Sequence, residues 1–406
     1  MIPFSPPRID SKIVEEVAAA LYSGWITTGP RTKMFEQELE HFTGASKVLC
    51  LNSATAGLEV MLRWFGVGKG DEVIVPAYTY AATANVIIHC GAKPVFVDSG
   101  DDFNLDVDAV GRAVTSKTKA IITVDIGGLP CDYLKIAELN KSERVKSLFV
   151  PATEEQALLG RPLMIADAAH SLGATYAGCP VGHPDLADTT VFSFHAVKNL
   201  TTAEGGAVCL NLPKPFDNIE LYKYLCVKSL HGQNKDAFQK NQMGNWRYDI
   251  IEAGYKFNMT DVQAAMGLVE LRRYRSDMLP KRKYIFEKYS EGFKNKKWAR
   301  LPVTETDIKQ TSYHAFMLRI NGISEEQRDA IIQDIFLAGV AVNVHFIPLP
   351  MMTLYKNMGY QIKDYPKAYK LFASEISLPV YYSLTDEQIQ KIIWVVGVAV
   401  EENLIK

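Results

Sequence analysis

The chain has 406 residues, of which 48% are hydrophobic and 22% are charged, and this length and composition are typical of a globular protein with two or three domains. The formal net charge of -2 provides no basic surface for nucleic acid and no attraction to an anionic membrane, so neither is expected as a partner. Six cysteines without a CxxC pair, and no apolar run approaching the roughly 20 residues that cross a bilayer, argue against a disulfide-built domain and a membrane span and favour a cytoplasmic location.

Short β-branched and apolar runs alternate with helix-like segments between about residues 45 and 212. Several of these runs are continuously apolar, which is typical of strands that helices cover on both faces. The helical segments between them predict a mainly parallel sheet in a large α/β domain. The seven predicted strands are residues 47–51, 72–76, 94–98, 120–125, 163–167, 189–194 and 207–210.

Two segments outside these strands are expected to lie at the surface. Residues 141–161 are rich in charge and are expected to be an excursion between a helix and the fifth strand. Residues 214–290 are expected to be mostly helical and loop-rich, and within them residues 233–250 show no period and predict a mobile loop. The large domain is expected to cover residues 1–290.

From about residue 300 the pattern changes to that of a smaller α+β unit. Strands are predicted at residues 314–320 and 340–347. Two helices are expected to begin at Ser324 and Thr385, because each hydroxyl is followed three residues later by a glutamine, the spacing of a capping box. We therefore expect a small C-terminal domain over residues 291–406.

A lysine that could act as a nucleophile follows the sixth strand, in the stretch FSFHAVKNLTTAEGG (residues 192–206). Lys198 is expected in a turn at the carboxyl edge of the sheet, where ligands of open α/β sheets bind. In a sheltered pocket an amine loses its proton easily and becomes a nucleophile toward an aldehyde. Considered alone, a lysine in such a turn is more often a solvated side chain.

An acidic residue ends the fifth strand, in the stretch IADAAHSLG (residues 165–173). Asp167 lies 31 positions before Lys198 (198 − 167), about one strand–helix–strand unit, so the two strand ends are expected side by side. A carboxylate there suits pyridoxal phosphate, whose ring nitrogen needs an acid partner. Considered alone, Asp167 is more often a helix N-cap, and His170 a histidine in the first turn of that helix.

Two further stretches complete a possible cofactor site. The stretch LNSATAG (residues 51–57) ends a strand and opens a helix, whose first N–H groups attract phosphate, and Thr55 adds a hydroxyl. After the second strand, Tyr78 and Tyr80 offer an aromatic face for a flat ring. Each stretch alone has a plainer explanation, as an ordinary capped helix and as tyrosines of the core.

Taken together and in this order, these stretches resemble the DegT/DnrJ/EryC1/StrS family of sugar aminotransferases. The resemblance covers nearly the whole chain and implies a fold-type-I transferase, similar to aspartate aminotransferase, that depends on pyridoxal phosphate. Four motifs carry it: SGWITTGP at residues 23–30, DAAH at 167–170, SFHAVKN at 193–199 and GYKFNMTD at 254–261.

The resemblance also implies roles for single residues. Lys198 would hold the cofactor as a Schiff base, Asp167 would pair with the pyridine nitrogen, and His170 would lie near the ring hydroxyl. The other cofactor residues that it implies are Thr55, Ala56 and Ser193 at the phosphate, Tyr80 stacked on the ring, and Asn258 reaching the phosphate from the second subunit of a homodimer. Trp25, Thr27 and His345 would lie near the sugar nucleotide, with residues 1–30 on the substrate side. No metal is implied.

The SFHxxKN form, followed by Glu204, Gly205 and Gly206, is similar to the branch that aminates C4 of a nucleotide-linked 4-keto sugar. L-glutamate is the amino donor that the resemblance implies, and the 4-amino product would serve a surface polysaccharide or glycoconjugate. Three alternatives stay open: a sugar dehydratase of the family, a 3-keto sugar aminotransferase, and a regulatory protein that kept the fold. Lys198 argues against the dehydratases, which carry histidine in its place.

Two features depart from the family pattern. Asp125 stands where many relatives have a histidine, and this difference is expected to affect the cofactor surroundings or the substrate preference. The charged segment 141–161 is longer than is usual for the family, and it is expected to affect only the surface or a contact with a partner subunit.

Overall fold

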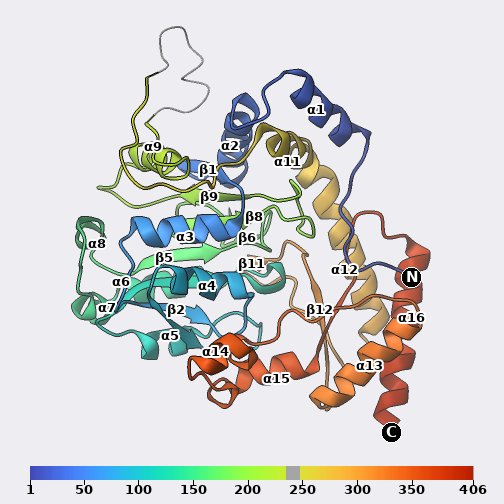
Figure 1. Ribbon diagram of the computed structural model, residues 1–406. Helices are drawn as coiled ribbons and strands as arrows, with labels where there is room; N and C mark the ends of the chain where they lie inside the picture. The colour runs from blue at the N-terminus through green and yellow to red at the C-terminus, as the bar shows by residue number, and fades with distance from the viewer. Residues whose placement is uncertain (235–246, 406) are drawn as a thin grey trace.

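The computed structural model describes residues 1–234 and 247–405 and contains a seven-stranded sheet in the order β1-β9-β8-β5-β4-β2-β3 (Figure 1). Only β9 is antiparallel to its neighbours β1 and β8, and the other neighbouring strands pair in parallel. The strands are β1 (Lys47–Leu51), β2 (Glu72–Pro76), β3 (Lys93–Val97), β4 (Thr118–Val124), β5 (Leu163–Asp167), β8 (Thr189–Ser193) and β9 (Gly206–Leu210). The predicted mainly parallel sheet is therefore confirmed.

Helices cover both faces of this sheet, and the apolar residues of its strands divide between two cores. In β4, Ile122 belongs to one core and Ile121 to the other, because successive side chains of a strand point to opposite faces. The first face packs against α3 (Ala54–Trp64), α4 (Ala81–His89) and α9 (Asn218–Lys228). The second face packs against α2 (Pro30–Thr43), α5 (Val107–Ala113), α6 (Tyr133–Lys141) and α11 (Asp261–Arg273). This three-layer α/β arrangement is the predicted fold class.

A third core belongs to a smaller sheet in the order β10-β12-β13, formed by β10 (Ala299–Arg300), β12 (Phe316–Ile320) and β13 (Glu375–Leu378). Helices α12 (Leu279–Phe293), α13 (Glu325–Leu337) and α16 (Asp386–Ile405) pack on it (Figure 1). Both predicted capping boxes are present, at Ser324 and at Thr385. Because α12 runs through residue 290 and packs on this core, the division into domains at that residue stays a proposal.

The prediction of a strand at residues 340–347 is wrong. Only two isolated bridges form there, Val340 with Ile2 and Asn343 with Ser377. The backbone groups of His345 bond instead to side chains, since its N–H donates to Glu375 and its carbonyl accepts from the hydroxyl of Tyr78. The segment therefore bends toward the large sheet and does not extend the small one.

The first residues of the chain form an N-terminal strap, residues 2–10, that runs along the small unit. The N–H of Ile2 donates to the carbonyl of Gly339 at 2.8 Å, and Ala341 donates back to Ile2 at 3.0 Å. Farther along, the guanidinium of Arg8 lies 2.6 Å from the carboxylate of Asp277. These contacts fix the strap from both of its ends.

The remaining elements are short or peripheral. They are α1 (Ser11–Tyr22), η1 (Ile126–Gly128), α7 (Glu143–Leu148), α8 (Glu154–Leu159), β6 (Thr175–Tyr176), β7 (Cys179–Pro180), η2 (Tyr274–Met278), β11 (Lys309–Gln310), η3 (Leu349–Met351), α14 (Thr353–Asn357), η4 (Ile362–Asp364) and α15 (Pro366–Ser374). The six cysteines all lie in the described part of the chain and none forms a disulfide. No described helix is long and apolar enough to cross a membrane. Most of the predicted mobile loop, residues 235–246, lies outside the described residues.

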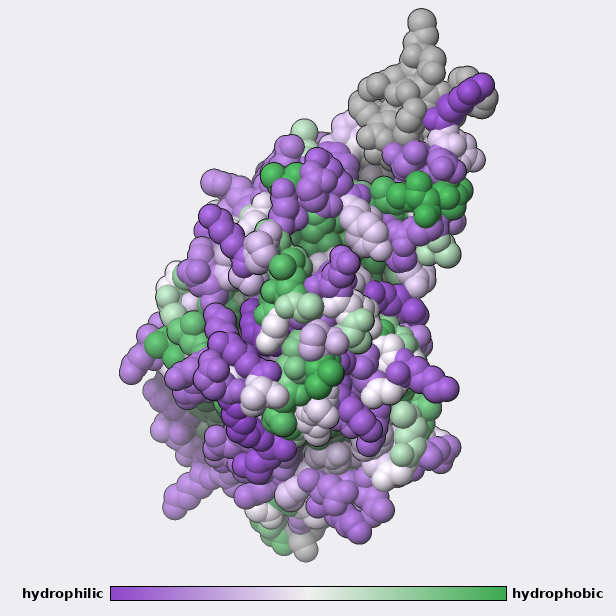
Figure 2. All heavy atoms as spheres, turned by 90° about the vertical axis from the view of Figure 1, so that its left-hand side faces the viewer, coloured by the Kyte–Doolittle hydropathy of each residue, from purple (hydrophilic) through white to green (hydrophobic). Residues whose placement is uncertain are grey.

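The charged segment 141–161 forms the two short helices α7 and α8 at one end of the large sheet (Figure 1). The left-hand side of Figure 1, where α7 and α8 lie, faces the viewer in Figure 2 and is mostly hydrophilic with small hydrophobic patches. The segment is nevertheless anchored at its end, because Arg161 is buried and bonds to both carboxylate oxygens of Asp188 at 2.7 Å. Asp188 also accepts the N–H of Met164 in β5, so this ion pair fixes the segment to the sheet.

Replacing Asp188 by asparagine is expected to destabilise the protein by about 3–5 kcal/mol, because the buried guanidinium of Arg161 then lacks its counter-charge. The measurement is the free energy of unfolding from urea titration. The matched control is Glu143→Gln, which removes an exposed ion pair with Lys146 and is expected to change little. Equal effects of the two substitutions would contradict the structural role of Asp188.

Candidate active site

A pocket of about 360 Å³ lies at the carboxyl edge of the large sheet, and Asn343, His345 and Phe346 form part of its lining. It collects residues that follow the ends of β1, β2, β5 and β8, because the carboxyl ends of parallel strands meet at one edge. The sequence-predicted residues that line it are Thr55, Tyr80, Asp167, His170, Ser193, Lys198 and His345.

Lys198 reaches the pocket from the turn after β8. The next residue, Asn199, is buried and anchors the turn, since its Nδ2 donates to the carbonyl of Ser312 at 2.9 Å and its Oδ1 lies 2.8 Å from Nδ1 of His314. Burial lowers the pKa of the Lys198 ammonium from 10.5 to about 8, and the carboxylate of Asp167 only partly opposes this shift. Among the described residues, none forms a hydrogen bond with Nζ. The amine is therefore partly neutral near pH 7 to 8 and available to a ligand.

Asp167 ends β5 inside the pocket. One carboxylate oxygen accepts the hydroxyl of Thr83 at 2.9 Å, and the other accepts the N–H of Ala169 at 3.2 Å. Burial raises the pKa of this carboxyl, and the hydrogen bonds from Thr83 and Ala169 oppose the shift. A cationic partner in the pocket would favour the ionised form further. The expected closeness of Asp167 and Lys198 is seen, since both line the pocket and each affects the charge of the other.

Asp125, the departure from the family pattern, lies beside the site but does not line the pocket. Its carboxylate accepts the hydroxyls of Tyr133 and Ser171, each at 2.6 Å, and the N–H of Cys131 at 2.8 Å. Burial raises the pKa of this carboxyl to about 6, against these hydrogen bonds. Its backbone N–H donates to the carbonyl of Asp167, so Asp125 supports the strand end that carries the site acid.

Another wall of the pocket consists of the rings of His170, His314, His345 and Phe346. The ring of His170 stacks on that of His314, with centroids 4.1 Å apart, and lies 5.7 Å from that of Phe346. Its Nδ1 is buried and has no hydrogen-bond partner in the described part of the chain. Burial and the nearby Lys198 keep the pKa of His170 well below 6.5 and lower that of His345 to about 4. These rings are therefore neutral at physiological pH.

The start of α3 forms a cradle for an anion. Ser53 is the N-cap, and its hydroxyl accepts the N–H of Ala56 at 3.1 Å. The N–H groups of Ala54 and Thr55, the first two residues of the helix, have no partner within the helix. Gly206 begins β9 directly against this turn. A Cβ atom at Gly206 would lie 2.4 Å from the backbone N of Ala54, so only glycine lets the two segments approach this closely.

Four predicted site residues do not line the pocket of their own chain. The N–H of Ala56 is taken by Ser53, and Ala54 lines the pocket in its place. Asn258 bonds to the hydroxyl of Thr28 at 2.7 Å. Trp25 and Thr27 lie with Thr28 in the connection between α1 and α2, outside the pocket. The roles predicted for Asn258, Trp25 and Thr27 therefore require a second subunit.

Sequence reasoning missed several residues of the site. Thr83, His314 and Phe346 line the pocket, and Phe4 of the N-terminal strap stacks on His345 with centroids 5.6 Å apart. Thr83 could have been predicted from the sequence, because it lies three residues after Tyr80. The other residues carry no local signal, since their place is set by contacts between distant parts of the chain.

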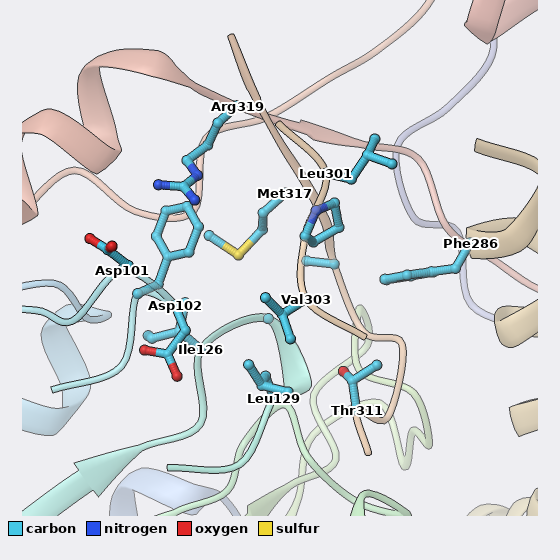
Figure 3. Close-up of a pocket in the computed structure, with 14 residues that line it drawn as sticks. Asp101, Asp102, Ile126, Leu129, Phe286, Leu301, Val303, Thr311, Met317 and Arg319 are labelled. Atoms are coloured by element: carbon cyan, nitrogen blue, oxygen red, sulfur yellow. The ribbon is translucent and has the colours of Figure 1, made fainter. Parts of the chain in front are cut away.

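Two other groups of residues in the described chain enclose a small space or bring donor atoms together. Figure 3 shows a second pocket, lined by Asp101 and Asp102 from the loop after β3 and by Met317 and Arg319 from strand β12. Its volume of about 30 Å³ holds no more than a water molecule or two. Such a space is too small for a substrate.

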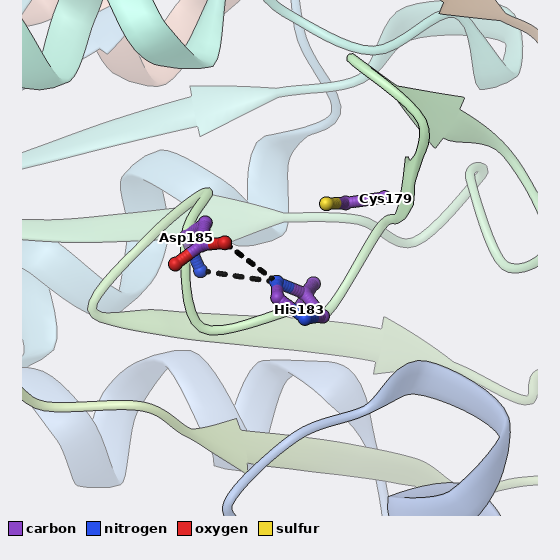
Figure 4. A group of neighbouring side chains, drawn as sticks. All are labelled: Cys179, His183 and Asp185. Carbon is purple, nitrogen blue, oxygen red and sulfur yellow. Dashed lines mark hydrogen bonds and ion pairs between the residues drawn. The ribbon is translucent and has the colours of Figure 1, made fainter.

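The other group consists of Cys179, His183 and Asp185, whose donor atoms lie within 4.8 Å of one another (Figure 4). Nδ1 of His183 already accepts the N–H of Asp185 at 3.3 Å and lies 3.4 Å from its carboxylate. The side chain of Asp185 is 74% exposed, so water competes for it. We interpret this group as a hydrogen-bonded turn at the surface beside a thiol.

The chain matches the DegT/DnrJ/EryC1/StrS aminotransferase family over residues 7–396. It belongs to this family. The fold and the convergence of Lys198 and Asp167 in one pocket agree with that membership, and the chain is an aminotransferase.

Individual relatives cover nearly all of the chain. Spr1654 of Streptococcus pneumoniae, described as a sugar aminotransferase in PMP form, is 46% identical, with a TM-score of 0.95 over 99% of this chain and 100% of that one, and it was also solved in PLP form. PseC of Helicobacter pylori, an aminotransferase in the biosynthesis of pseudoaminic acid, is 27% identical, with a TM-score of 0.86 over 99% of both chains. The spore coat polysaccharide biosynthesis protein SpsC of Bacillus subtilis is 35% identical over 97% of this chain and 95% of its own length.

Gly206→Ala is expected to weaken the binding of pyridoxal phosphate roughly tenfold or more, because the new methyl group displaces the turn at Ser53 and Ala54 by which α3 begins. The measurement is titration of the cofactor-free protein by absorbance. Gly68→Ala is the control, since a Cβ atom there meets nothing within 4 Å. Unchanged affinity in the Gly206 variant would show that the cradle does not hold the phosphate.

Proposed function

We propose that the enzyme transfers an amino group from L-glutamate to the ketone of a nucleotide-linked 4-keto sugar, with pyridoxal phosphate as cofactor. The product is a 4-amino sugar nucleotide for a surface polysaccharide or glycoconjugate. The observation that carries this proposal is the meeting of Lys198 and Asp167 in one buried pocket, because this cofactor requires an amine to hold it and an acid for its ring nitrogen.

The pocket fits the cofactor at both ends. At the anionic end, the hydroxyls of Thr55 and Ser193 and the first turn of α3 would bind the phosphate. At the ring end, Asp167 would pair with the pyridine nitrogen, and the ring of Tyr80, which is 64% exposed, would stack on the cofactor. The unpartnered Nδ1 of His170 would bond to the ring hydroxyl.

When bound, pyridoxal phosphate supplies an aldehyde that joins amines and a ring that disperses negative charge. Lys198 would hold the cofactor through its amine, and once the amino donor has displaced it, Nζ is free to take up a proton and deliver it to another carbon. A pKa of about 8 suits both actions near neutral pH. Asp167, in its ionised form, would keep a proton on the ring nitrogen throughout.

The substrate side of the proposal rests on relatives and on one pocket wall. SpsC and PseC are named for polysaccharide and pseudoaminic acid biosynthesis, which supports a sugar substrate. His345 faces the pocket and would contact the sugar nucleotide. In a homodimer, Trp25, Thr27 and Asn258 would reach the partner's pocket, Asn258 at the phosphate.

The test is a panel of UDP-, GDP- and dTDP-linked 4-keto sugars with L-glutamate. Glutamate is expected to change the absorbance of the holoenzyme, and the correct keto sugar to restore it. Amination of 3-keto sugars alone would contradict the proposed position of the ketone. Consumption of a sugar nucleotide without any amino donor would indicate a dehydratase, and a protein that stays colourless with pyridoxal phosphate would contradict the whole proposal.

Lys198→Ala is expected to lower the rate of transamination by at least about 10²–10⁴-fold, because the variant lacks the amine that is proposed to carry the proton. Borohydride is expected to fix the cofactor to the wild-type chain but not to the variant, as mass spectrometry would detect. Lys283→Ala, at an exposed position of α12, serves as the control and should behave as wild type. Turnover by the Lys198 variant at the wild-type rate would remove this residue from the mechanism.

A further inference from the structure

Behind His345, a buried hydrogen-bond chain leads away from the pocket into the small sheet. Nδ1 of His345 lies 2.9 Å from Oγ of Ser377, and that hydroxyl bonds to Oε1 of Glu375. Oε2 of Glu375 accepts the backbone N–H of His345 at 3.0 Å. Glu375 and Ser377 lie two residues apart on β13, on the same face of the strand, and both are fully buried.

His345 is held so that only one ring nitrogen is left for a ligand. Phe4 stacks on the ring, and the hydroxyl of Tyr78 donates to the carbonyl of His345 at 2.5 Å. Ser377 occupies Nδ1, while Nε2 bonds to none of the described residues, and the side chain lines the pocket. A substrate in the pocket therefore meets His345 through Nε2.

The chain from Glu375 to His345 has two possible directions, because a hydroxyl both donates and accepts. When Glu375 is ionised, Ser377 donates to it, so Nδ1 of His345 carries the proton and Nε2 is a bare acceptor. When Glu375 is protonated, its own hydroxyl donates to Ser377, which then donates to Nδ1, and the ring proton must lie on Nε2. The state of one buried carboxyl thus decides which group the pocket presents.

We propose that Glu375 is a positioning residue that, through Ser377, sets whether Nε2 of His345 donates or accepts a hydrogen bond toward the substrate. This inference rests on the proposed function and deepens it. A ketone or phosphate oxygen only accepts, whereas the ammonium group of an amino product only donates. The protonated state of Glu375 therefore favours the keto sugar, and the ionised state favours the amino sugar.

The surroundings place this change near neutral pH. Burial raises the pKa of Glu375 to about 8, against the hydrogen bonds from Ser377 and from the N–H of His345 and against the positive charge of Arg328. Arg328 lies on α13 and donates to the carbonyls of Phe372 and Glu375. Tyr78, whose hydroxyl donates to the His345 carbonyl, stays neutral, because burial and the charge of Glu375 raise its pKa and the charges of Arg328 and Arg319 oppose this only in part.

The sign of the pH dependence follows from these groups. Below pH about 8 Glu375 is protonated and Nε2 donates, and above it Nε2 accepts. His345 itself stays neutral through this range, since burial and the charge of Lys198 lower its pKa to about 4. The change is thus one of tautomer, with no change in the charge of the ring.

The direct test is nitrogen-15 NMR of histidine-labelled holoenzyme between pH 6.5 and 9.5, with the His345 signal identified by its loss in His345→Gln. The proton is expected on Nε2 at low pH and on Nδ1 at high pH. In Glu375→Gln the amide oxygen must face the N–H of His345, so its NH2 group faces Ser377 and fixes the proton on Nε2 at every pH. Glu326→Gln, an exposed carboxyl on α13, is the control and should switch as wild type.

Ser377 supplies a second, independent variant. Ser377→Ala is expected to make the tautomer independent of pH, and Ser377→Thr to restore the switch, because threonine keeps the hydroxyl. A wild-type His345 that keeps one tautomer across the range would overturn the proposal, as would a switch that survives in Ser377→Ala.

Kinetics provide the functional readout. The kcat/KM for the keto sugar is expected to fall roughly tenfold above pH 8 in the wild type and to stay level in Glu375→Gln, the size expected for one hydrogen bond. The same fall in both proteins would overturn the role of Glu375. A switching His345 in an enzyme that accepts no keto sugar would instead overturn only the proposed function.

Discussion

The meeting of parallel strand ends at one edge of the large sheet is the constraint on which the site depends. Asp167 is the last residue of β5, and Lys198 follows the neighbouring strand β8 after one turn. Thr55 follows β1, and Thr83 follows β2. Strand β9 runs the opposite way, so it brings the amino end of the strand, Gly206, to the same edge. A sheet with other directions would scatter these groups over both edges.

Loss of water sets the electrostatics of the pocket in one consistent sense. Burial disfavours every charge there, so the pKa of Asp167 rises while the pKa values of Lys198, His170 and His345 fall. The pKa values of His170 and His345 fall so far that both rings are neutral, whereas the pKa of Lys198 is about 8. The amine of Lys198 can therefore both release and recover a proton near neutral pH.

The sequence was sufficient for the parts of the fold that follow local rules. Apolar runs predict the strands of the large sheet, and hydroxyl–glutamine spacing predicts the starts of α13 and α16. Motifs predict Lys198 and Asp167. The prediction failed at residues 340–347, where an apolar run bends because side chains from β13 and from the end of β2 take its backbone groups. Phe4, His314 and Ser377 escaped for the same reason, since their roles come from contacts across the chain that no local pattern records.

The N-terminal strap also has a consequence for how the protein matures. During synthesis, Ile2 leaves the ribosome long before its partner Gly339 exists, and at 5–20 residues per second the delay is roughly 20 to 70 s. The large sheet has time to form in that interval, but the wall made by Phe4 and His345 does not. Until translation has passed residue 345, the nascent chain therefore lacks the wall that Phe4 and His345 form beside the pocket.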